Sequence, residues 1–181
     1  TAAAYVELLD SAAFAFHCVG EAAGGEFEQG GLHVGRVDCR LIEIAERGFQ
    51  PVLTTGPAPR ETALAAEIIS RCRIPPIDLS GRLTLKQLGA VIASARLSIC
   101  VDSVPMHLAA ALGTPVVALF GPSNEHEWGP WQVPQRVLVS DHACRPCRLD
   151  GCGGGKVSEC LTVLRPKTVL AAINSLLVET A

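Results

Sequence analysis

The sequence has few aromatic residues, few lysines and no long hydrophobic run, and each shortage excludes a class of protein. Aromatic residues make up 4% of the 181 residues, so the core must be built from aliphatic side chains. Acidic residues outnumber basic ones by eighteen to fifteen, which argues against a protein that binds nucleic acid. No apolar run reaches the roughly 18 residues that a membrane-spanning helix needs. Residues 1–4 lack the basic segment that is typical of a signal peptide.

The chain is rich in aliphatic residues and in cysteine. Hydrophobic residues make up 49% of the sequence, which is enough to bury a core and excludes a disordered chain. Because so apolar a chain does not need disulfides to fold, we expect a cytoplasmic protein. Four of the eight cysteines lie in separate apolar segments and are interpreted as small buried residues, namely Cys18, Cys39, Cys72 and Cys100.

From residue 50 onward, short apolar runs alternate with helical patterns. Thr84 and Gln87 have the spacing of a capping box, Pro105 suits the first turn of a helix, and Gly113 suits its end. This alternation predicts an α/β fold, a Rossmann-like parallel sheet with helices on both faces. The predicted strands are 51–55, 76–79, 97–101, 115–120 and 136–140, and the predicted helices are 60–71, one from Thr84, 105–112 and one from Pro166.

The first 48 residues have a weaker pattern. A strand is predicted over 13–19 and a helix over 39–47, and the Gly- and Glu-rich stretch 20–35 between them is interpreted as a loop. We therefore divide the chain into a divergent leading segment, residues 1–48, and the main part of the same domain, residues 49–181.

The segment from Asp102 to His107 lies between an apolar strand and an Ala-rich helix. Such a junction favours anions, because the first amides of a helix are unpaired and the helix dipole is positive there. The Ser103 hydroxyl and the His107 ring could add hydrogen bonds to a phosphate, and Asp102 could accept hydrogen bonds from sugar hydroxyls. Alternatively, Asp102 or Ser103 only caps the helix and His107 is an ordinary surface residue.

The stretch 79–123 resembles the C-terminal domain of the glycosyltransferase family 9 heptosyltransferases, which use ADP-heptose to build lipopolysaccharide. The motifs Asp-Ser-x-Pro-Met-His at 102–107 and Phe-Gly-Pro-Ser at 120–123 carry this resemblance. The Cys-Arg-Pro-Cys motif at 144–147 and the segment 151–161 resemble the heptosyltransferase III branch in particular. The resemblance implies a GT-B enzyme of two lobes, of which this chain is the lobe that binds the nucleotide sugar.

The resemblance also implies roles for individual residues. It places Ser103, the amides of Val104 and Met106, and His107 on the diphosphate, Asp102 on the heptose, Glu61 on the adenosine ribose, and Gly121 and Ser123 near the nucleotide. The implied reaction inverts the anomeric centre without a metal or another cofactor. Its general base and its acceptor site would belong to an N-terminal domain outside this chain, so the chain alone would be inactive.

The implied partners are ADP-heptose and, through the other lobe, the lipopolysaccharide core, with no nucleic acid. The implied location is the cytoplasm, with peripheral contact to the inner membrane as an open option. The chain departs from the family at Val104, where the family usually has glycine, and in residues 10–40, which lack the lysine that contacts the phosphates. Arg36 and Arg40 are the candidates to replace that lysine.

Two alternatives to a heptosyltransferase remain open, a non-catalytic nucleotide-sugar-binding remnant and a small zinc-stabilised interaction domain. The second rests on a bunch of cysteines whose spacing suits tetrahedral zinc, although a reduced thiol cluster or disulfides fit it as well. The segment 124–128 is interpreted as a polar loop that Trp128 and Trp131 pack down. His17, His33 and His142 have no partner at ligand spacing and are interpreted as structural or exposed. The bunched cysteines are Cys144, Cys147, Cys152 and Cys160.

Overall fold

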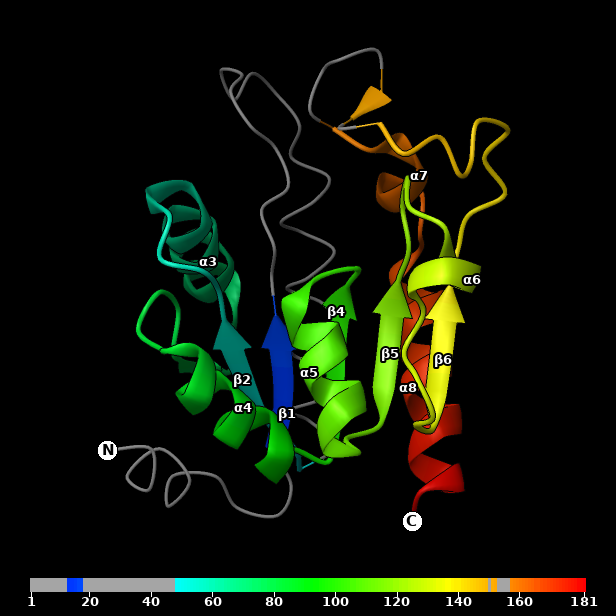
Figure 1. The fold of residues 1–181 in the computed structure, drawn as a ribbon. Coiled ribbons are helices and arrows are strands. Elements are labelled where there is room, and N and C mark those ends of the chain that lie inside the picture. Colours follow the sequence, from blue (N-terminus) through cyan, green and yellow to red (C-terminus); the bar gives the residue numbers. More distant parts are fainter. Residues whose placement is uncertain (1–12, 18–47, 150, 153–156) are drawn as a thin grey trace.

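The computed structural model describes residues 13–17, 48–149, 151–152 and 157–181. Within them lies a six-stranded sheet with the strand order β3-β2-β1-β4-β5-β6, in which every pair of neighbouring strands is parallel (Figure 1). This order is that of a Rossmann-type doubly wound sheet, so the predicted fold class is confirmed. The strands are β1 (Ala13–His17), β2 (Gln50–Thr54), β3 (Ile77–Asp78), β4 (Leu97–Val101), β5 (Val116–Leu119) and β6 (Gln135–Leu138).

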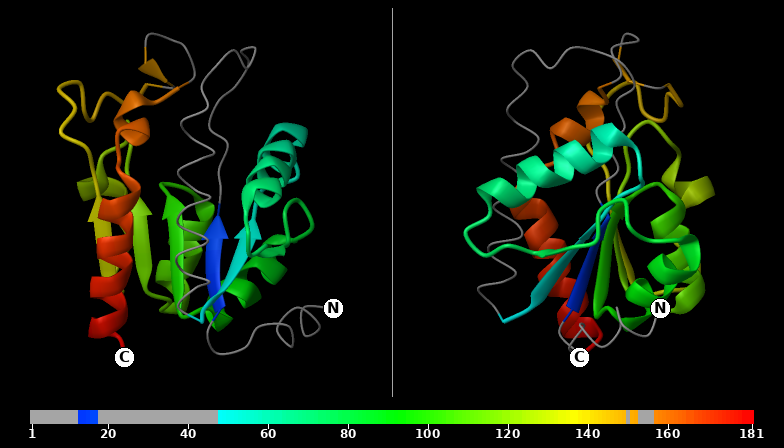
Figure 2. Two further views of the ribbon diagram at one scale, coloured as in Figure 1. Left: turned by 180° about the vertical axis from the view of Figure 1, so that it is seen from behind. Right: turned by 90° about the vertical axis from the view of Figure 1, so that its left-hand side faces the viewer.

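Helices cover both faces of the sheet (Figure 2). Successive residues of a strand point to opposite faces, and β4 shows how the two faces are packed. Its Leu97 and Ile99 belong to a core formed with α3 and α8, whereas Cys100 belongs to a second core formed with α4 and α5. The helices are α3 (Pro59–Arg71), α4 (Leu85–Ser94), α5 (Val104–Leu112), α6 (Glu125–Trp128), α7 (Glu159–Thr162) and α8 (Pro166–Glu179).

The helix ends follow the local sequence signals. At the start of α4, the Thr84 amide donates to Gln87 Oε1 at 2.9 Å and the Gln87 amide donates to Thr84 Oγ1 at 3.4 Å, which confirms the predicted capping box. At the end of α5, Gly113 adopts φ 76°, a left-handed conformation that favours glycine. These signals fix the start of α4 and the end of α5, two helices that pack in the same core on one face of the sheet.

Other sequence expectations need correction or lie outside the described residues. The polar loop expected over 124–128 is instead the short helix α6, and Trp128 and Trp131 are 54% and 75% exposed rather than packed down. Cys100 is buried as expected, and Cys72 is half-buried. The predicted strand 13–19 is present as β1. The predicted loop 20–35, the helix 39–47, Cys18, Cys39, His33, Arg36 and Arg40 all lie outside the described residues.

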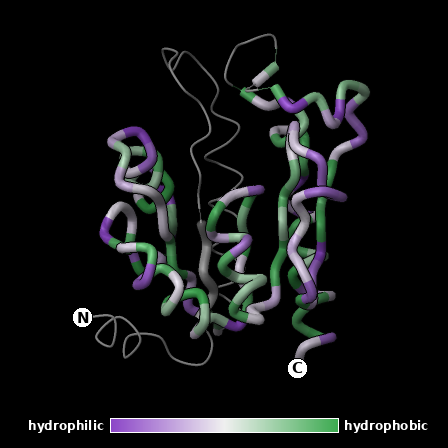
Figure 3. The backbone as a smooth tube through the Cα atoms, viewed as in Figure 1, coloured by the Kyte–Doolittle hydropathy of each residue, from purple (hydrophilic) through white to green (hydrophobic). Residues whose placement is uncertain are grey.

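The strands all run in the same direction, so their carboxyl ends meet at one edge of the sheet, the upper edge in Figure 1. The strands are mainly hydrophobic, whereas hydrophilic residues are common in the segments above this edge (Figure 3). The order of strands reverses between β1 and β4, and ligands of doubly wound sheets bind beside such a reversal. The loop after β4 therefore occupies the position where a ligand is expected. Among the described residues, no helix combines the length and the hydrophobicity that a bilayer crossing requires.

Candidate functional site

A pocket of about 440 Å³ opens at the carboxyl ends of β4 and β5. Three segments that are far apart in the sequence form its walls: the end of β4, the loop and short helix after β5, and the segment that leads into α7. Three of the predicted site residues, Asp102, Gly121 and Ser123, line this pocket. The lining residues are Val101, Asp102, Leu119, Gly121, Pro122, Ser123, Asn124, Glu127, Trp128, Arg148, Leu149 and Leu161.

Asp102 and His107 form a pair at the start of α5. His107 Nε2 lies 3.8 Å from Asp102 Oδ1, and the two side chains are 49% and 23% exposed. Asp102 lines the pocket, whereas His107 is not among the lining residues. The structure therefore connects His107 to the pocket through Asp102, and the carboxylate remains accessible as a hydrogen-bond acceptor.

The first turn of α5 offers fewer hydrogen-bond donors than the sequence indicates. Ser103 occupies the N-cap position without a side-chain cap, and its hydroxyl donates to the Val101 carbonyl at 3.1 Å. The amides of Met106 and His107 both donate to the Ser103 carbonyl. Because Pro105 has no N–H, the Val104 amide is the donor that this first turn retains.

Met106 and Val104 have different environments. The Met106 side chain is 0% exposed and packs in the core with α4, and its amide donates to the Ser103 carbonyl, so a contact between this amide and a ligand stays a prediction. Val104 is the first residue of α5 and is 57% exposed. Its φ is not positive, so valine adopts this backbone conformation without strain.

Gly121 lies where the loop after β5 meets α7. An added Cβ would lie 2.7 Å from Leu161 Cγ, so only glycine allows this close approach. The Gly121 carbonyl also accepts a hydrogen bond from Arg145 Nε at 2.6 Å, and Arg145 Nη2 lies 2.9 Å from Glu125 Oε2. The Arg145 side chain is 8% exposed, so it joins two walls of the pocket from beneath the surface.

The helix position of Glu125 and its ion pair lower the pKa of this residue. Its own backbone amide at the start of α6 is the main cause, and the nearby Arg145 guanidinium adds to it. Burial acts in the opposite direction. The carboxylate is therefore held in its charged form, which keeps Arg145 in place under the pocket.

Sequence reasoning did not assign Arg148 to the site, yet this residue lines the pocket and is the one cation among the lining residues of the described chain. Its Nη2 lies 2.6 Å from Glu127 Oε1, and its amide donates to the Pro122 carbonyl at 2.8 Å. The backbone of Arg148 adopts φ 60°, a left-handed conformation that residues other than glycine rarely adopt. Only the tertiary fold shows its role, because it lies 24 positions after Asn124 in the sequence.

Glu61 lies apart from the other predicted site residues. It is in the first turn of α3, beyond the end of β2, and its carboxylate lies directly against Gly56. It is not among the residues that line the pocket, and β1 separates β2 from β4 in the sheet. The structure therefore does not bring Glu61 to the same pocket as Asp102.

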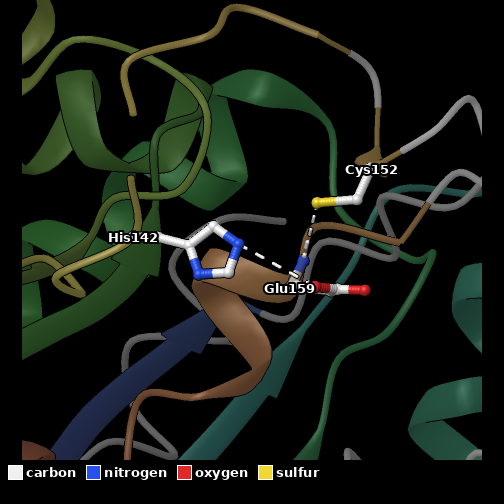
Figure 4. A group of neighbouring side chains, drawn as sticks. All are labelled: His142, Cys152 and Glu159. Atoms are coloured by element: carbon white, nitrogen blue, oxygen red, sulfur yellow. Dashed lines mark hydrogen bonds and ion pairs between the residues drawn. The ribbon is translucent and has the colours of Figure 1, made fainter. Parts of the chain in front are cut away.

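A second group of side chains lies in the segment that leads to α7 (Figure 4). One nitrogen of His142, the sulfur of Cys152 and one carboxylate oxygen of Glu159 all lie within 4.8 Å of one another. Among the described residues, no other group of three or more potential metal ligands meets this criterion, so the four bunched cysteines do not form such a group by themselves. The expectation that His142 lacks a suitable partner is wrong.

The strand order and the position of the pocket define the class of protein as a Rossmann-type α/β domain with its candidate site at the strand ends. The family model of glycosyltransferase family 9 (heptosyltransferase) matches residues 41–157, so the chain belongs to this family. It is 45% identical over 133 residues to lipopolysaccharide heptosyltransferase 3 of Escherichia coli, a match that covers 72% of this chain and 38% of the relative.

Two solved structures are similar to this one. The glycosyl transferase family 9 protein of Veillonella parvula superposes with a TM-score of 0.78 at 25% identity, over 98% of this chain and 50% of that chain. The ADP-heptose lipopolysaccharide heptosyltransferase II of E. coli superposes with a TM-score of 0.73 at 24% identity, over 98% of this chain and 51% of that chain. The chain thus spans about half the length of these two solved proteins. Its match to heptosyltransferase 3 of E. coli covers 38% of that relative.

Proposed function

We propose that this chain is the donor-binding lobe of an inverting heptosyltransferase, which transfers heptose from ADP-heptose to the lipopolysaccharide core. Membership of glycosyltransferase family 9 and the similarity to a lipopolysaccharide heptosyltransferase support the reaction class. The pocket at the ends of β4 and β5 is the single observation that supports donor binding, because a carboxylate and an arginine line it and the N-terminus of α5 follows two residues after Asp102.

The chemistry of these three groups matches the parts of a nucleotide sugar. The Asp102 carboxylate would accept hydrogen bonds from heptose hydroxyls. The Val104 amide and the positive end of α5 would face the diphosphate, as helix N-termini do at many phosphates. The Arg148 guanidinium would donate to phosphate oxygens in two-point geometry. Arg148 would then make the contact to the phosphates that the resemblance assigns to a lysine, which residues 10–40 lack.

A ligand that enters the pocket would meet the ion pair between Arg148 and Glu127. In the structure Glu127 Oε1 lies 2.6 Å from Arg148 Nη2, and the side chains of Arg148 and Glu127 are 64% and 47% exposed. A diphosphate carries more charge than one carboxylate and would compete with Glu127 for the guanidinium. The Ser103 hydroxyl would have to turn away from the Val101 carbonyl before it could donate to a phosphate, because it now donates to that carbonyl.

In this proposal the lobe stabilises the leaving group, and the rest of the enzyme supplies the nucleophile. As the glycosidic bond to ADP breaks, charge develops on the diphosphate, and Arg148 and the α5 N-terminus would stabilise it. The acceptor sugar and the general base would come from a part of the enzyme outside this chain, so no residue here is assigned as the base. The reaction would take place in the cytoplasm, with peripheral contact at the inner membrane.

Titration calorimetry of the chain with ADP and with ADP-heptose tests donor binding. Arg148→Ala should weaken the binding of both ligands by about 10- to 150-fold, the range for the loss of a hydrogen bond to a charged group. Asp102→Ala should weaken ADP-heptose more than ADP, because its contact is to the sugar. Arg71→Ala is the matched control, since Arg71 also pairs with a glutamate but lies at the end of α3.

The proposal is contradicted if the unmodified chain binds neither ligand. It is also contradicted if Arg148→Ala and Arg71→Ala have the same effect, because the pocket arginine would then have no special role. Equal effects of Asp102→Ala on ADP and ADP-heptose would remove the assignment of Asp102 to the sugar.

A further inference from the structure

The segment between β6 and α7 carries a set of metal-ligating side chains that the donor site does not use. His142 and Cys152 lie on this segment, and Glu159 is the first residue of α7. Figure 4 shows the three side chains turned toward one another. His142 Nε2 lies 3.8 Å from Glu159 Oε2, and the Glu159 amide donates to Cys152 Sγ at 3.4 Å.

These three ligand types suit zinc and related divalent transition metals. A structural zinc ion takes imidazole, thiolate and carboxylate ligands in tetrahedral geometry, with bonds of about 2.0–2.3 Å. Ligand atoms around such an ion lie about 3–4 Å from one another, so separations of up to 4.8 Å need only a small contraction. The amide of Glu159 already donates to the Cys152 sulfur, a contact that would also stabilise a metal-bound thiolate.

A fourth ligand is close at hand. Cys144 is exposed and lies only two residues after His142 in the sequence. A thiol close to His142 in the sequence and open to solvent is therefore the candidate that would complete the set.

We propose that His142, Cys152 and Glu159, with Cys144 as the fourth ligand, bind one zinc-class divalent metal ion. The ligands would be the His142 imidazole nitrogen, the Cys152 and Cys144 thiolates and one Glu159 carboxylate oxygen. Two thiolates and one carboxylate carry three negative charges against the two positive charges of the metal.

The metal would have a structural role at the wall of the pocket. It would join the segment that carries Cys144 to the start of α7, and both elements contribute to the pocket through Arg148 and Leu161. The two cores of the sheet contain none of the four ligands. Removal of the metal should therefore loosen this wall and leave the sheet and the large helices folded.

Metal analysis of the chain purified under reducing conditions, with zinc supplied and excess zinc removed, tests the proposal without any nucleotide. We expect one equivalent of zinc for each chain. Substitution by cobalt should produce the visible bands of a tetrahedral site and the ultraviolet charge-transfer band of thiolate ligands. A chain that retains no zinc and gives no thiolate-to-cobalt band would overturn the proposal, whatever the outcome of the ADP titrations.

Matched variants test the ligand set. Cys152→Ser and His142→Ala should lose the bound zinc, and Cys144→Ser should lose half of the cobalt–thiolate intensity. Cys72→Ser and His126→Ala are the controls and should keep one equivalent. The Cys72 thiol donates to the Ile68 carbonyl at the end of α3. His126 pairs with Glu125 at 4.0 Å and, within the described part of the chain, belongs to no group of three or more potential metal ligands.

Circular dichroism of each variant shows whether the sheet has folded, so that loss of metal is not mistaken for loss of the fold. Zinc retained by a folded Cys152→Ser variant would overturn the site. Zinc lost equally from the two controls would show that binding is not specific to this group and would overturn it as well. Undiminished cobalt–thiolate intensity in Cys144→Ser would overturn the assignment of the fourth ligand.

Discussion

Replacement of Gly121 by alanine tests the contact that closes the pocket between the loop after β5 and α7. The added Cβ would lie 2.7 Å from Cγ, 2.8 Å from Cδ1 and 3.4 Å from Cδ2 of Leu161. The first two distances are too short for carbon atoms, so Leu161 and α7 must move. The φ of Gly121 is not in the left-handed region, so the methyl group alone carries the effect.

Overpacking of this kind costs about 1–3 kcal/mol of the free energy of unfolding. In a chain of this size each kcal/mol lowers the melting temperature by about 2–4 °C. Gly89→Ala is the matched control. Gly89 lies in the middle of α4, and an added Cβ would meet Leu112 Cδ1 at 3.8 Å, an ordinary van der Waals contact. Alanine is favoured over glycine in a helix by about 1 kcal/mol, so this second substitution should stabilise the chain.

Urea and thermal unfolding of both variants provide the measurement, and a double-mutant cycle with Leu161→Ala identifies the cause. If the clash with Leu161 is responsible, Leu161→Ala should relieve most of the penalty of Gly121→Ala, with a coupling energy of about 1–2 kcal/mol. The reasoning would be refuted if Gly121→Ala were as stable as the unmodified chain. It would also be refuted if the two substitutions were additive, because α7 would then not pack against Gly121.

Three further predictions concern a strained residue, a helix cap and a charge. Arg148→Gly should unfold with about 1 kcal/mol more stability than Arg148→Ala, because glycine accepts φ 60° without strain; equal stability in urea would contradict this. Thr84→Ala should lower the free energy of unfolding by about 1 kcal/mol through loss of the capping box, and an unchanged urea midpoint would show that the cap contributes nothing. Folding lowers the pKa of Glu125 from its ordinary value of 4.5. The charged carboxylate therefore contributes its full stabilisation at pH values above 4.5, and this contribution is lost as the pH falls through the pKa of the folded state. Melting temperatures followed from neutral pH to about pH 3 should therefore fall less steeply for Glu125→Gln than for the unmodified chain, and parallel curves would contradict the assignment.

The fold could be predicted from the sequence because its signals are local. The apolar run 97–101 coincides with β4, and the helix that the Thr84 capping box predicts begins at Leu85. Parallel strands covered on both faces give nearly continuous apolar runs, which are easily recognised between helical patterns. The short helices α6 and α7 were not predicted, since four residues are too few to show a helical period.

The candidate site could be predicted only where one motif carries it. Asp102 and Gly121 belong to motifs that directly follow strands, and both line the pocket. Met106 belongs to the same motif as Asp102, but the phase of α5 turns its side chain into the core. Arg148 reaches the pocket, and His142 meets Glu159, through folding of a segment without regular structure, and sequence spacing does not predict such contacts.

The most direct test of the central claim is amide hydrogen exchange of the chain with and without saturating ADP-heptose. The account predicts ligand-dependent protection in two segments, 102–104 at the start of α5 and 121–124 after β5, since both border the pocket. The start of α4, on the other side of the sheet reversal, should exchange at an unchanged rate. Absence of protection in both segments, or protection confined to other parts of the chain, would contradict the assignment of this pocket to the nucleotide sugar.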